Sequence, residues 1–181
     1  MTKIINNYFK NFTSTLGSIS KEQVGALVSA VKNLNKNNNR LFICGNGGSG
    51  ANAIHLANDL LFSKSSNTSI DVEALTSNSA ILTCLANDLG YKHIFSKQLE
   101  VKAKKNDMLL IFSGSGNSPN IIEAAQVAKK LKMSIFAIVG FDGGKCKKII
   151  KNCIHININD MQISEDFQMI IGHIIMKSII K

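Results

Sequence analysis

A glycine-rich turn followed by a histidine and an aspartate is the stretch of this sequence best suited to chemistry. Residues 45–48, Gly-Asn-Gly-Gly, follow an apolar run, and Ser49 opens a segment with helical spacing. The first N–H groups of a helix have no partner within it and attract anions, so a phosphate is the expected ligand. His55 and Asp59, four residues apart, share one helix face and can act on one ligand or metal ion, although an ordinary surface pair has the same spacing.

A second turn rich in glycine and serine lies at residues 113–119, Ser-Gly-Ser-Gly-Asn-Ser-Pro. The hydroxyls of Ser113, Ser115 and Ser118 can donate to phosphate oxygens, and the start of the next helix adds backbone donors. One loop of this kind could simply cap a helix. Two such loops after two strands of one sheet favour a phosphorylated ligand.

The first turn also satisfies the spacing G-x-G-x-x-G of dinucleotide-binding folds. Those folds carry an acidic residue at the end of the second strand, about 20 residues past the motif. Here the second predicted strand ends in Leu75-Thr76-Ser77, and its acidic residues, Asp71 and Glu73, come earlier. The dinucleotide interpretation is therefore weakened in favour of a monophosphate.

Apolar runs alternate with segments of helical spacing from Arg40 onward, which predicts alternating strands and helices. The predicted strands cover residues 40–44, 69–75, 107–112, 133–139 and 153–157, and the predicted helices cover residues 49–62, 77–103, 118–132, 144–151 and 162–180. This alternation predicts a five-stranded parallel sheet with helices on both faces, a flavodoxin-like three-layer α/β sandwich. Ligands of such sheets bind at the carboxyl ends of the strands, where both glycine-rich loops fall.

Two amphipathic helices, at residues 3–16 and 20–37, precede the first predicted strand. We expect them to cover the sheet or to mediate oligomer contacts. No linker or internal repeat divides the chain. We therefore predict one domain over residues 1–181, made of the helical pair (1–38) and an α/β core (39–181).

Composition argues against several classes of protein. The chain has 181 residues, 45% of them hydrophobic, and no apolar run long enough to span a membrane. Its N-terminus does not resemble a signal peptide, so we expect a cytoplasmic protein. The 21 basic residues outnumber 12 acidic ones but fall in short groups at predicted helix ends, which favours solvated charge over nucleic-acid binding. The four cysteines lack metal-site spacing, so buried free thiols are expected.

Six short motifs mark the chain from its first strand to its last helix. They are CGNGGS at 44–49, AxxxHLAxDL at 51–60, ANDxGY at 86–91, SGSGNSPN at 113–120, DGGK at 142–145 and IIGH in the final helix. In this order they resemble a SIS (sugar isomerase) domain, and more closely its phosphoheptose isomerase branch, across nearly the whole chain. The resemblance implies a homotetramer with its site at a subunit interface. It also implies interconversion of sedoheptulose 7-phosphate and glycero-manno-heptose 7-phosphate, often with zinc.

The resemblance assigns roles to individual residues. Those that match substrate-binding positions are Asn46, Gly47, Gly48, Ser49, Asp59, Asn87, Asp88, Ser113, Gly114, Ser115, Ser118 and Glu165, of which Ser49, Ser113, Ser115 and Ser118 match the phosphate site. Those that match the metal ligands are His55, Asp59, Glu165 and His173. The same resemblance makes Asp59, Glu165 and His173 the catalytic residues and one zinc ion per subunit the possible cofactor.

Four positions depart from the family pattern. Asp59 stands where the family has a glutamate, Glu165 where it has a glutamine, Gly114 where it has a threonine, and Asn78 where an aspartate is common. Binding of a sugar phosphate tolerates these changes better than the choice of exact substrate does.

Aldose–ketose isomerisation requires a base that moves a proton between C1 and C2 through an enediol, and an acid that serves the oxygens. Histidine exchanges protons readily near neutral pH, which suits His173, with Asp59 or Glu165 as its partner. On an ideal helix Glu165 and His173 lie about 80° apart, whereas Asp166 and His173 are nearly aligned, so Asp166 is the alternative to Glu165.

Two rival interpretations stay open. One is a non-catalytic SIS module that binds a sugar phosphate or a protein partner. The other is an isomerase of hexose or pentose phosphates. Retention of two histidines with two carboxylates favours an enzyme, with a phosphorylated sugar as substrate and neither nucleic acid nor a membrane as partner.

Overall fold

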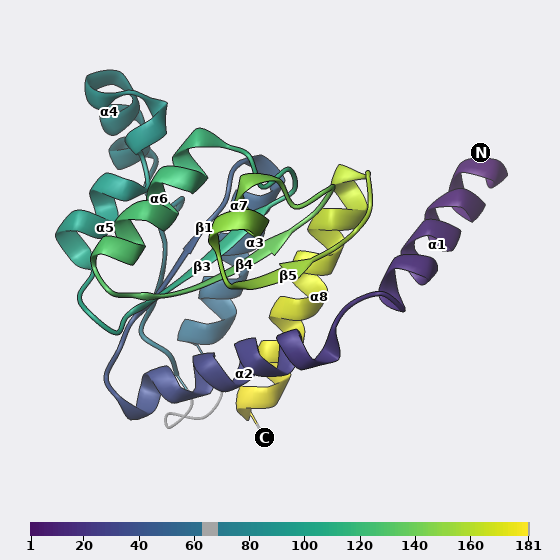
Figure 1. Cartoon of the computed structure of the whole chain (residues 1–181), viewed down its shortest axis with the longest axis horizontal. Helices are drawn as coiled ribbons and strands as arrows, with labels where there is room; N and C mark the ends of the chain where they lie inside the picture. The colour runs from purple at the N-terminus through teal and green to yellow at the C-terminus, as the bar shows by residue number, and fades with distance from the viewer. Residues whose placement is uncertain (63–68, 181) are drawn as a thin grey trace.

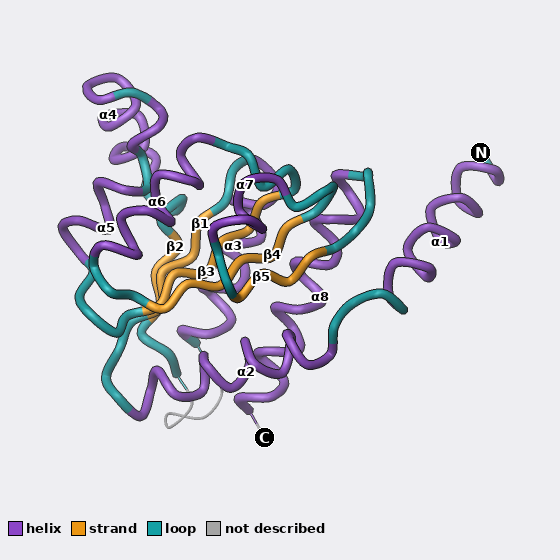
Figure 2. Tube along the Cα trace, viewed as in Figure 1, coloured by secondary structure: helices purple, strands orange, loops and turns teal. Residues whose placement is uncertain are grey.

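A parallel sheet of five strands forms the centre of the molecule in this computed structural model, which describes residues 1–62 and 69–180 (Figure 2). The strands are β1 (Leu41–Cys44), β2 (Val72–Ala74), β3 (Met108–Ser113), β4 (Ser134–Val139) and β5 (Asn152–His155). They lie in the order β2-β1-β3-β4-β5, and each neighbouring pair is parallel. This is the flavodoxin-like order, so the predicted fold class is confirmed.

Helices cover both faces of this sheet (Figure 1). One face carries α2 (Lys21–Lys36), α3 (Gly47–Leu61) and α8 (Met161–Ile180), and the other carries α5 (Ser96–Lys102), α6 (Pro119–Lys130) and α7 (Gly144–Ile149). The remaining helices are α1 (Thr2–Leu16) and α4 (Ser79–Leu89). Among the described residues, no helix is both long and apolar enough to cross a lipid bilayer.

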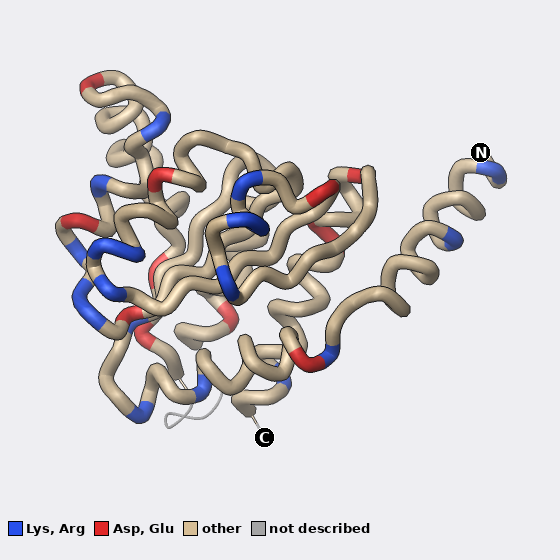
Figure 3. The backbone as a smooth tube through the Cα atoms, viewed as in Figure 1, with Lys and Arg blue, Asp and Glu red and all other residues tan. Residues whose placement is uncertain are grey.

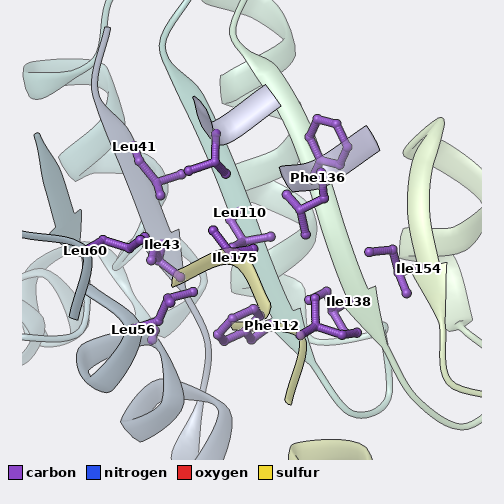
Figure 4. Close-up of a cluster of buried hydrophobic side chains, with 14 of the residues drawn as sticks. Leu41, Ile43, Leu56, Leu60, Leu110, Phe112, Phe136, Ile138, Ile154 and Ile175 are labelled. Atoms are coloured by element: carbon purple, nitrogen blue, oxygen red, sulfur yellow. The ribbon is translucent and has the colours of Figure 1, made fainter. Parts of the chain in front are cut away.

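Alternate side chains of each strand supply the two cores. In β1, Leu41 and Ile43 face α2, α3 and α8, whereas Phe42 and Cys44 face the opposite layer. Figure 4 shows the first core, where Leu56 of α3 and Ile175 of α8 meet the strand residues. Because both faces are covered, the strands read as continuous apolar runs, which is why they were predictable from sequence.

The helix predicted over residues 77–103 is wrong as a single element. The chain forms α4, then a short 3-10 turn η1 (Tyr91–His93), then α5. Gly90 ends α4 with φ of +91°, a conformation that side-chain-bearing residues rarely adopt. The apolar spacing continues on both sides of this glycine, and it therefore concealed the break.

Helices α1 and α4 stand away from the sandwich (Figure 1). Helix α4 buries none of its side chains, and α1 buries only Thr15. The Phe12 ring attaches α1 by stacking on Phe167 of α8, with 4.8 Å between centroids. The Tyr8 hydroxyl adds a hydrogen bond to Asp166, and burial together with that carboxylate raises the pKa of Tyr8 to about 12, which keeps the donor protonated.

Basic residues lie at the carboxyl ends of several helices, as predicted, and Figure 3 marks their positions along the backbone. Lys102 lies in the last turn of α5, Lys129 and Lys130 in that of α6, and Lys147 and Lys148 in that of α7. Positive charge at the carboxyl end of a helix complements the helix dipole.

Asp107 joins three segments at the amino end of the sheet. Its side chain accepts hydrogen bonds from the backbone N–H groups of Arg40 and Lys104, both at 2.9 Å, and only 1% of the residue is exposed. The carboxylate therefore fixes the starts of β1 and β3 relative to each other.

We expect Asp107→Ala to lower the free energy of unfolding by about 2–4 kcal/mol, because it leaves two backbone donors near the core without a partner. The matched control is Asp71→Ala, since the exposed Asp71 pairs with Arg40 at 2.9 Å and should contribute less than about 1 kcal/mol. Urea unfolding followed by circular dichroism measures both. Equal losses for the two variants would contradict the assigned role of Asp107.

Candidate active site

The two glycine-rich loops lie side by side at the carboxyl ends of β1 and β3. These strands pair directly, with Cys44 opposite Ile111. Beyond them, Asn46 Nδ2 donates to Asn120 Oδ1 at 3.0 Å, and Asn120 Nδ2 donates to Asn46 Oδ1 at 2.8 Å. The structure thus joins the two predicted halves of a phosphate cradle.

The first loop presents the amino end of α3. The helix begins at Gly47, two residues earlier than predicted, so Ser49 is buried in the first turn while Gly47 and Gly48 are exposed. Gly47 has φ of +53°, which favours glycine at this turn. The exposed start of α3 offers backbone N–H groups to an anion.

The second loop is held by its own serines and by the loop after β4. The buried Ser113 hydroxyl accepts from the N–H of Gly116 at 3.1 Å, and Ser115 Oγ accepts from that of Asn117 at 3.2 Å. Gly116 O accepts from the N–H of Cys146 at 3.0 Å. Ser118 and the adjacent start of α6 complete the loop. Ser113 is therefore engaged within the loop, whereas Ser118 makes no capping bond with its side chain.

The four cysteines carry free thiols, three of them buried and one exposed. Cys44, Cys146 and Cys153 are buried free thiols, as predicted, and burial raises the pKa of Cys146 to about 12 and that of Cys153 to about 11. The prediction is wrong for Cys84, which is exposed because it lies on the projecting helix α4.

Two histidines and an aspartate converge between α3 and α8. His55 Nε2 lies 3.3 Å from His173 Nε2 and 3.3 Å from Asp59 Oδ2, and His173 Nε2 lies 4.0 Å from that oxygen. The histidine side chains are about half exposed, and that of Asp59 is 27% exposed. The structure therefore brings together three of the four predicted metal ligands.

The spacing of these three atoms fits zinc. Tetrahedral zinc bonds to nitrogen and oxygen at about 2.0–2.2 Å, which separates neighbouring ligand atoms by roughly 3.3–3.5 Å. Two of the three separations equal 3.3 Å, and the third, from His173 Nε2 to Asp59 Oδ2, is longer at 4.0 Å. Three protein ligands with an open fourth position are the pattern of a catalytic zinc site.

Glu165 lies elsewhere in this subunit. Its carboxylate lies against Gly48, so close that a Cβ added to that glycine would clash with it. Helices α3 and α8 run in the same direction here, since Asn52 Nδ2 donates to Glu165 O at 2.9 Å while Leu56 lies beside Gly172. Glu165 thus faces the start of α3, and His173 lies eight residues further along α8. Asp166, the alternative, accepts from Tyr8 instead.

Asn87 and Asp88 are not brought to the cradle within one chain. Both are exposed on α4, where Asn87 Nδ2 donates to Asp88 Oδ1 at 2.8 Å. Asn78 acts as the cap of this helix, accepting from the N–H of Ile81 at 3.1 Å. A substrate role for Asn87 and Asp88 requires a surface that this chain does not itself provide.

Tyr91 and Asn120 are parts of the site to which sequence reasoning gave no role. The Tyr91 hydroxyl donates to Asn46 Oδ1 at 3.0 Å. Tyr91 and Asn46 line a cavity of about 360 Å³ beside the glycine turn. Asn120 is fully buried. Tyr91 ends the motif ANDxGY and Asn120 ends the motif SGSGNSPN, and these positions were the sequence signal that could have placed them in the site.

The fold and these motifs are those of a sugar isomerase domain, and the comparisons agree. The SIS domain family matches residues 7–140. A phosphoheptose isomerase of Akkermansia muciniphila is 34% identical over 172 residues, which cover 94% of this chain and 88% of that protein. Solved phosphoheptose isomerases of Francisella tularensis and Neisseria gonorrhoeae each give a TM-score of 0.90 at 26% identity, over 98% of this chain and 97% of theirs. The chain therefore belongs to the SIS domain family, within the phosphoheptose isomerases.

We expect Gly116→Ala to destabilise the second loop. Gly116 has φ of +63°, and an added Cβ would meet the backbone of Gly143, so strain of about 1–3 kcal/mol and loss of phosphate affinity should follow. Gly25→Ala is the control: this exposed helical glycine has open space around its Cα, and the change should raise stability by up to about 1 kcal/mol. Thermal unfolding and titration with inorganic phosphate measure both effects. Wild-type phosphate binding by Gly116→Ala would contradict the proposed role of the loop.

Proposed function

We propose that this protein is an aldose–ketose isomerase that interconverts sedoheptulose 7-phosphate and glycero-manno-heptose 7-phosphate. The reaction moves a proton between C1 and C2 through an enediol, and the product would serve synthesis of cell-surface polysaccharide. The observation that carries the proposal is the convergence of His55, Asp59 and His173 on a helix whose amino end forms half of an anion cradle. The relatives named phosphoheptose isomerase support the choice of substrate.

The length of the substrate suits the distance between these two features. Seven residues of α3 separate Gly48 from His55, a rise of about 10 Å. An open seven-carbon chain built from C–C bonds of ~1.5 Å spans a similar ~10 Å from C1 to a phosphorus on C7. A phosphate held between Ser113, Ser115, Ser118 and the starts of α3 and α6 would therefore leave C1 and C2 near the histidines.

The residues at the far end of α3 fit the chemistry. His55, Asp59 and His173 would hold one zinc ion, which when bound polarises the sugar carbonyl and favours removal of the neighbouring proton. Asp59 directs Oδ2 at the histidines, so Oδ1 is the carboxylate atom available to move a proton between C1 and C2. Glu165 lies against Gly48, so it would contact the hydroxyl groups of the sugar that lie nearer the phosphate. We therefore assign it to substrate binding ahead of metal binding.

We further propose a homotetramer in which a neighbouring subunit completes the site. Helix α4 projects from the sandwich and carries Asn87 and Asp88 on its surface, where they could enter the cradle of another copy. Helix α1 also exposes a set of apolar side chains, Ile4, Ile5, Phe9 and Leu16. Free thiols at all four cysteines support a reducing compartment, the cytoplasm.

The non-catalytic interpretation is less favoured. A binding module needs the cradle alone, whereas this chain also places two imidazoles and a carboxylate with ligand-like spacing at the seam of α3 and α8. Proteins that are similar to this chain over most of their length include enzymes named phosphoheptose isomerase.

We expect the purified protein to convert sedoheptulose 7-phosphate into the aldose, observed by NMR, and His173→Ala to lower kcat/KM by about 10²–10⁴-fold. Binding of the sugar phosphate, measured by calorimetry, should change little, because the cradle lies far from His173. Pentose 5-phosphates and hexose 6-phosphates in the same assay separate the rival substrates. An inactive wild type that still binds the heptose phosphate would instead support the non-catalytic interpretation.

We expect one zinc ion per subunit, and its loss in His55→Ala and His173→Ala, because each variant removes one of three ligands. His93→Ala is the control, since His93 lies on η1 outside the group. Equilibrium dialysis with metal analysis reports occupancy without depending on turnover. Undiminished zinc in both variants would place the metal elsewhere or show that it is not bound specifically.

A further inference from the structure

The orientation of the Asn120 side chain is set by a group that can only donate. The backbone N–H of Ile121 donates to Asn120 Oδ1 at 3.0 Å. The atom of Asn120 at that position is therefore the oxygen, and the other branch of the amide is the nitrogen. Because Asn120 is fully buried, no exchange with solvent offers an alternative arrangement.

Asn120 in turn sets the orientation of Asn46. Asn120 Nδ2 donates to Asn46 Oδ1 at 2.8 Å, and the hydroxyl of Tyr91 donates to the same oxygen at 3.0 Å. An amide oxygen has two lone pairs, so both are occupied. Asn46 Nδ2 uses one hydrogen on Asn120 Oδ1, at 3.0 Å. Among the described residues, the one polar group of the Asn46 side chain that is left without a partner is thus a single N–H.

This N–H belongs to the residue that precedes the first turn of α3. Asn46 is the N-cap of the helix, makes no capping bond with its side chain, and lines the cavity beside the glycine turn. The free N–H of Asn46 therefore lies next to the exposed Gly47 and Gly48, where it can contact the same ligand as these two residues. If the amide were reversed, it would present an oxygen there and repel a phosphate, carbonyl or enediolate oxygen.

We propose that Asn120 and Tyr91 are positioning residues that hold Asn46 as a hydrogen-bond donor to an oxygen of the substrate. The proposal rests on the proposed function for the identity of that substrate. It extends the site to two residues outside the predicted set, one from the start of α6 and one from η1. Tyr91 follows Gly90 at the base of α4, so it also connects the cradle to that projecting helix.

The test is a double-mutant cycle, in which each substitution is measured in the wild-type protein and in the Asn46→Ala variant. Asn120→Asp keeps the shape but puts an oxygen where Nδ2 donates to Asn46 Oδ1, so either orientation of the Asn46 amide sets its oxygen against a carboxylate oxygen, and Asn46 is no longer held as a donor to the substrate. We expect kcat/KM for sedoheptulose 7-phosphate to fall by about 10²–10³-fold, the usual cost of one lost donor to a charged oxygen. In the Asn46→Ala background the same change should cost less than about threefold, since its effect passes through Asn46. Equal losses in both backgrounds would overturn the proposal.

Tyr91→Phe gives a second, milder variant at a position that is 58% exposed, where folding is not at risk. It removes one of two donors to Asn46 Oδ1, and we expect a fall of about tenfold, again absent in the Asn46→Ala background. Asn152→Asp, at the amino end of β5, is the control for introducing a carboxylate. Wild-type kcat/KM in Tyr91→Phe, together with full activity in Asn120→Asp, would also overturn the proposal.

Measurements of substrate binding distinguish a failure of this proposal from a failure of the proposed function. The dissociation constant for sedoheptulose 7-phosphate is measured by calorimetry for the same variants. If the wild type binds but does not isomerise, the proposed reaction fails, and the cycle is read from the dissociation constants with the same expected non-additivity. A wild type that neither binds nor isomerises this sugar overturns both.

Discussion

The close, parallel packing of α3 on α8 is the contact on which the whole site depends. Gly172 permits it, because a Cβ at that position would come within 3.3 Å of the Leu56 side chain. Asn52 then fixes the register by donating to Glu165 O at 2.9 Å and to Gln168 Oε1 at 3.2 Å. With this register, one end of the seam places Glu165 at the start of α3 and the other joins His55, Asp59 and His173.

The cradle obeys a different constraint, which is close approach of backbone to backbone. At positions 116 and 144 a side chain would meet main-chain atoms of the neighbouring loop, and at position 45 it would meet those of the first turn of α3. The paired amides of Asn46 and Asn120 keep the starts of α3 and α6 together. In the proposed site, anion binding therefore falls to the backbone, whereas proton transfer and metal binding fall to exposed side chains between α3 and α8.

The sheet and its helices could be predicted because strands that are buried on both faces need apolar residues at consecutive positions, as in Leu109 to Phe112. Gly90 shows where this fails. Partly buried residues before it, Leu82 and Leu85, and buried residues after it, Ile94 and Phe95, contact the same core, so the apolar pattern continues past one residue of unusual φ. The pairing of His55 with Asp59 follows from local spacing. Their approach to His173 does not, since it depends on the packing of helices more than a hundred residues apart, and the family resemblance supplied it.

Glu165 illustrates the limit of a role assigned by resemblance. The family pattern made it a co-ligand of His173, although the two lie about 80° apart around the helix axis, and eight residues also separate them by a rise of about 12 Å. The positions of Asn87 and Asp88 raise a related difficulty. A motif can assign them to a substrate, but a single chain places them on the outside of α4. Their role depends on assembly, which local pattern does not encode.

In the proposed function, one sugar phosphate spans the distance from the cradle to the histidines. A crystal structure of the protein with zinc and sedoheptulose 7-phosphate would show where each end of the sugar lies. We expect the phosphate between the loop at residues 113–118 and the start of α3, with C1 and C2 beside Asp59 and a metal on His55 and His173. A phosphate bound away from both loops, or a sugar carbonyl far from Asp59 with the phosphate in place, would contradict it.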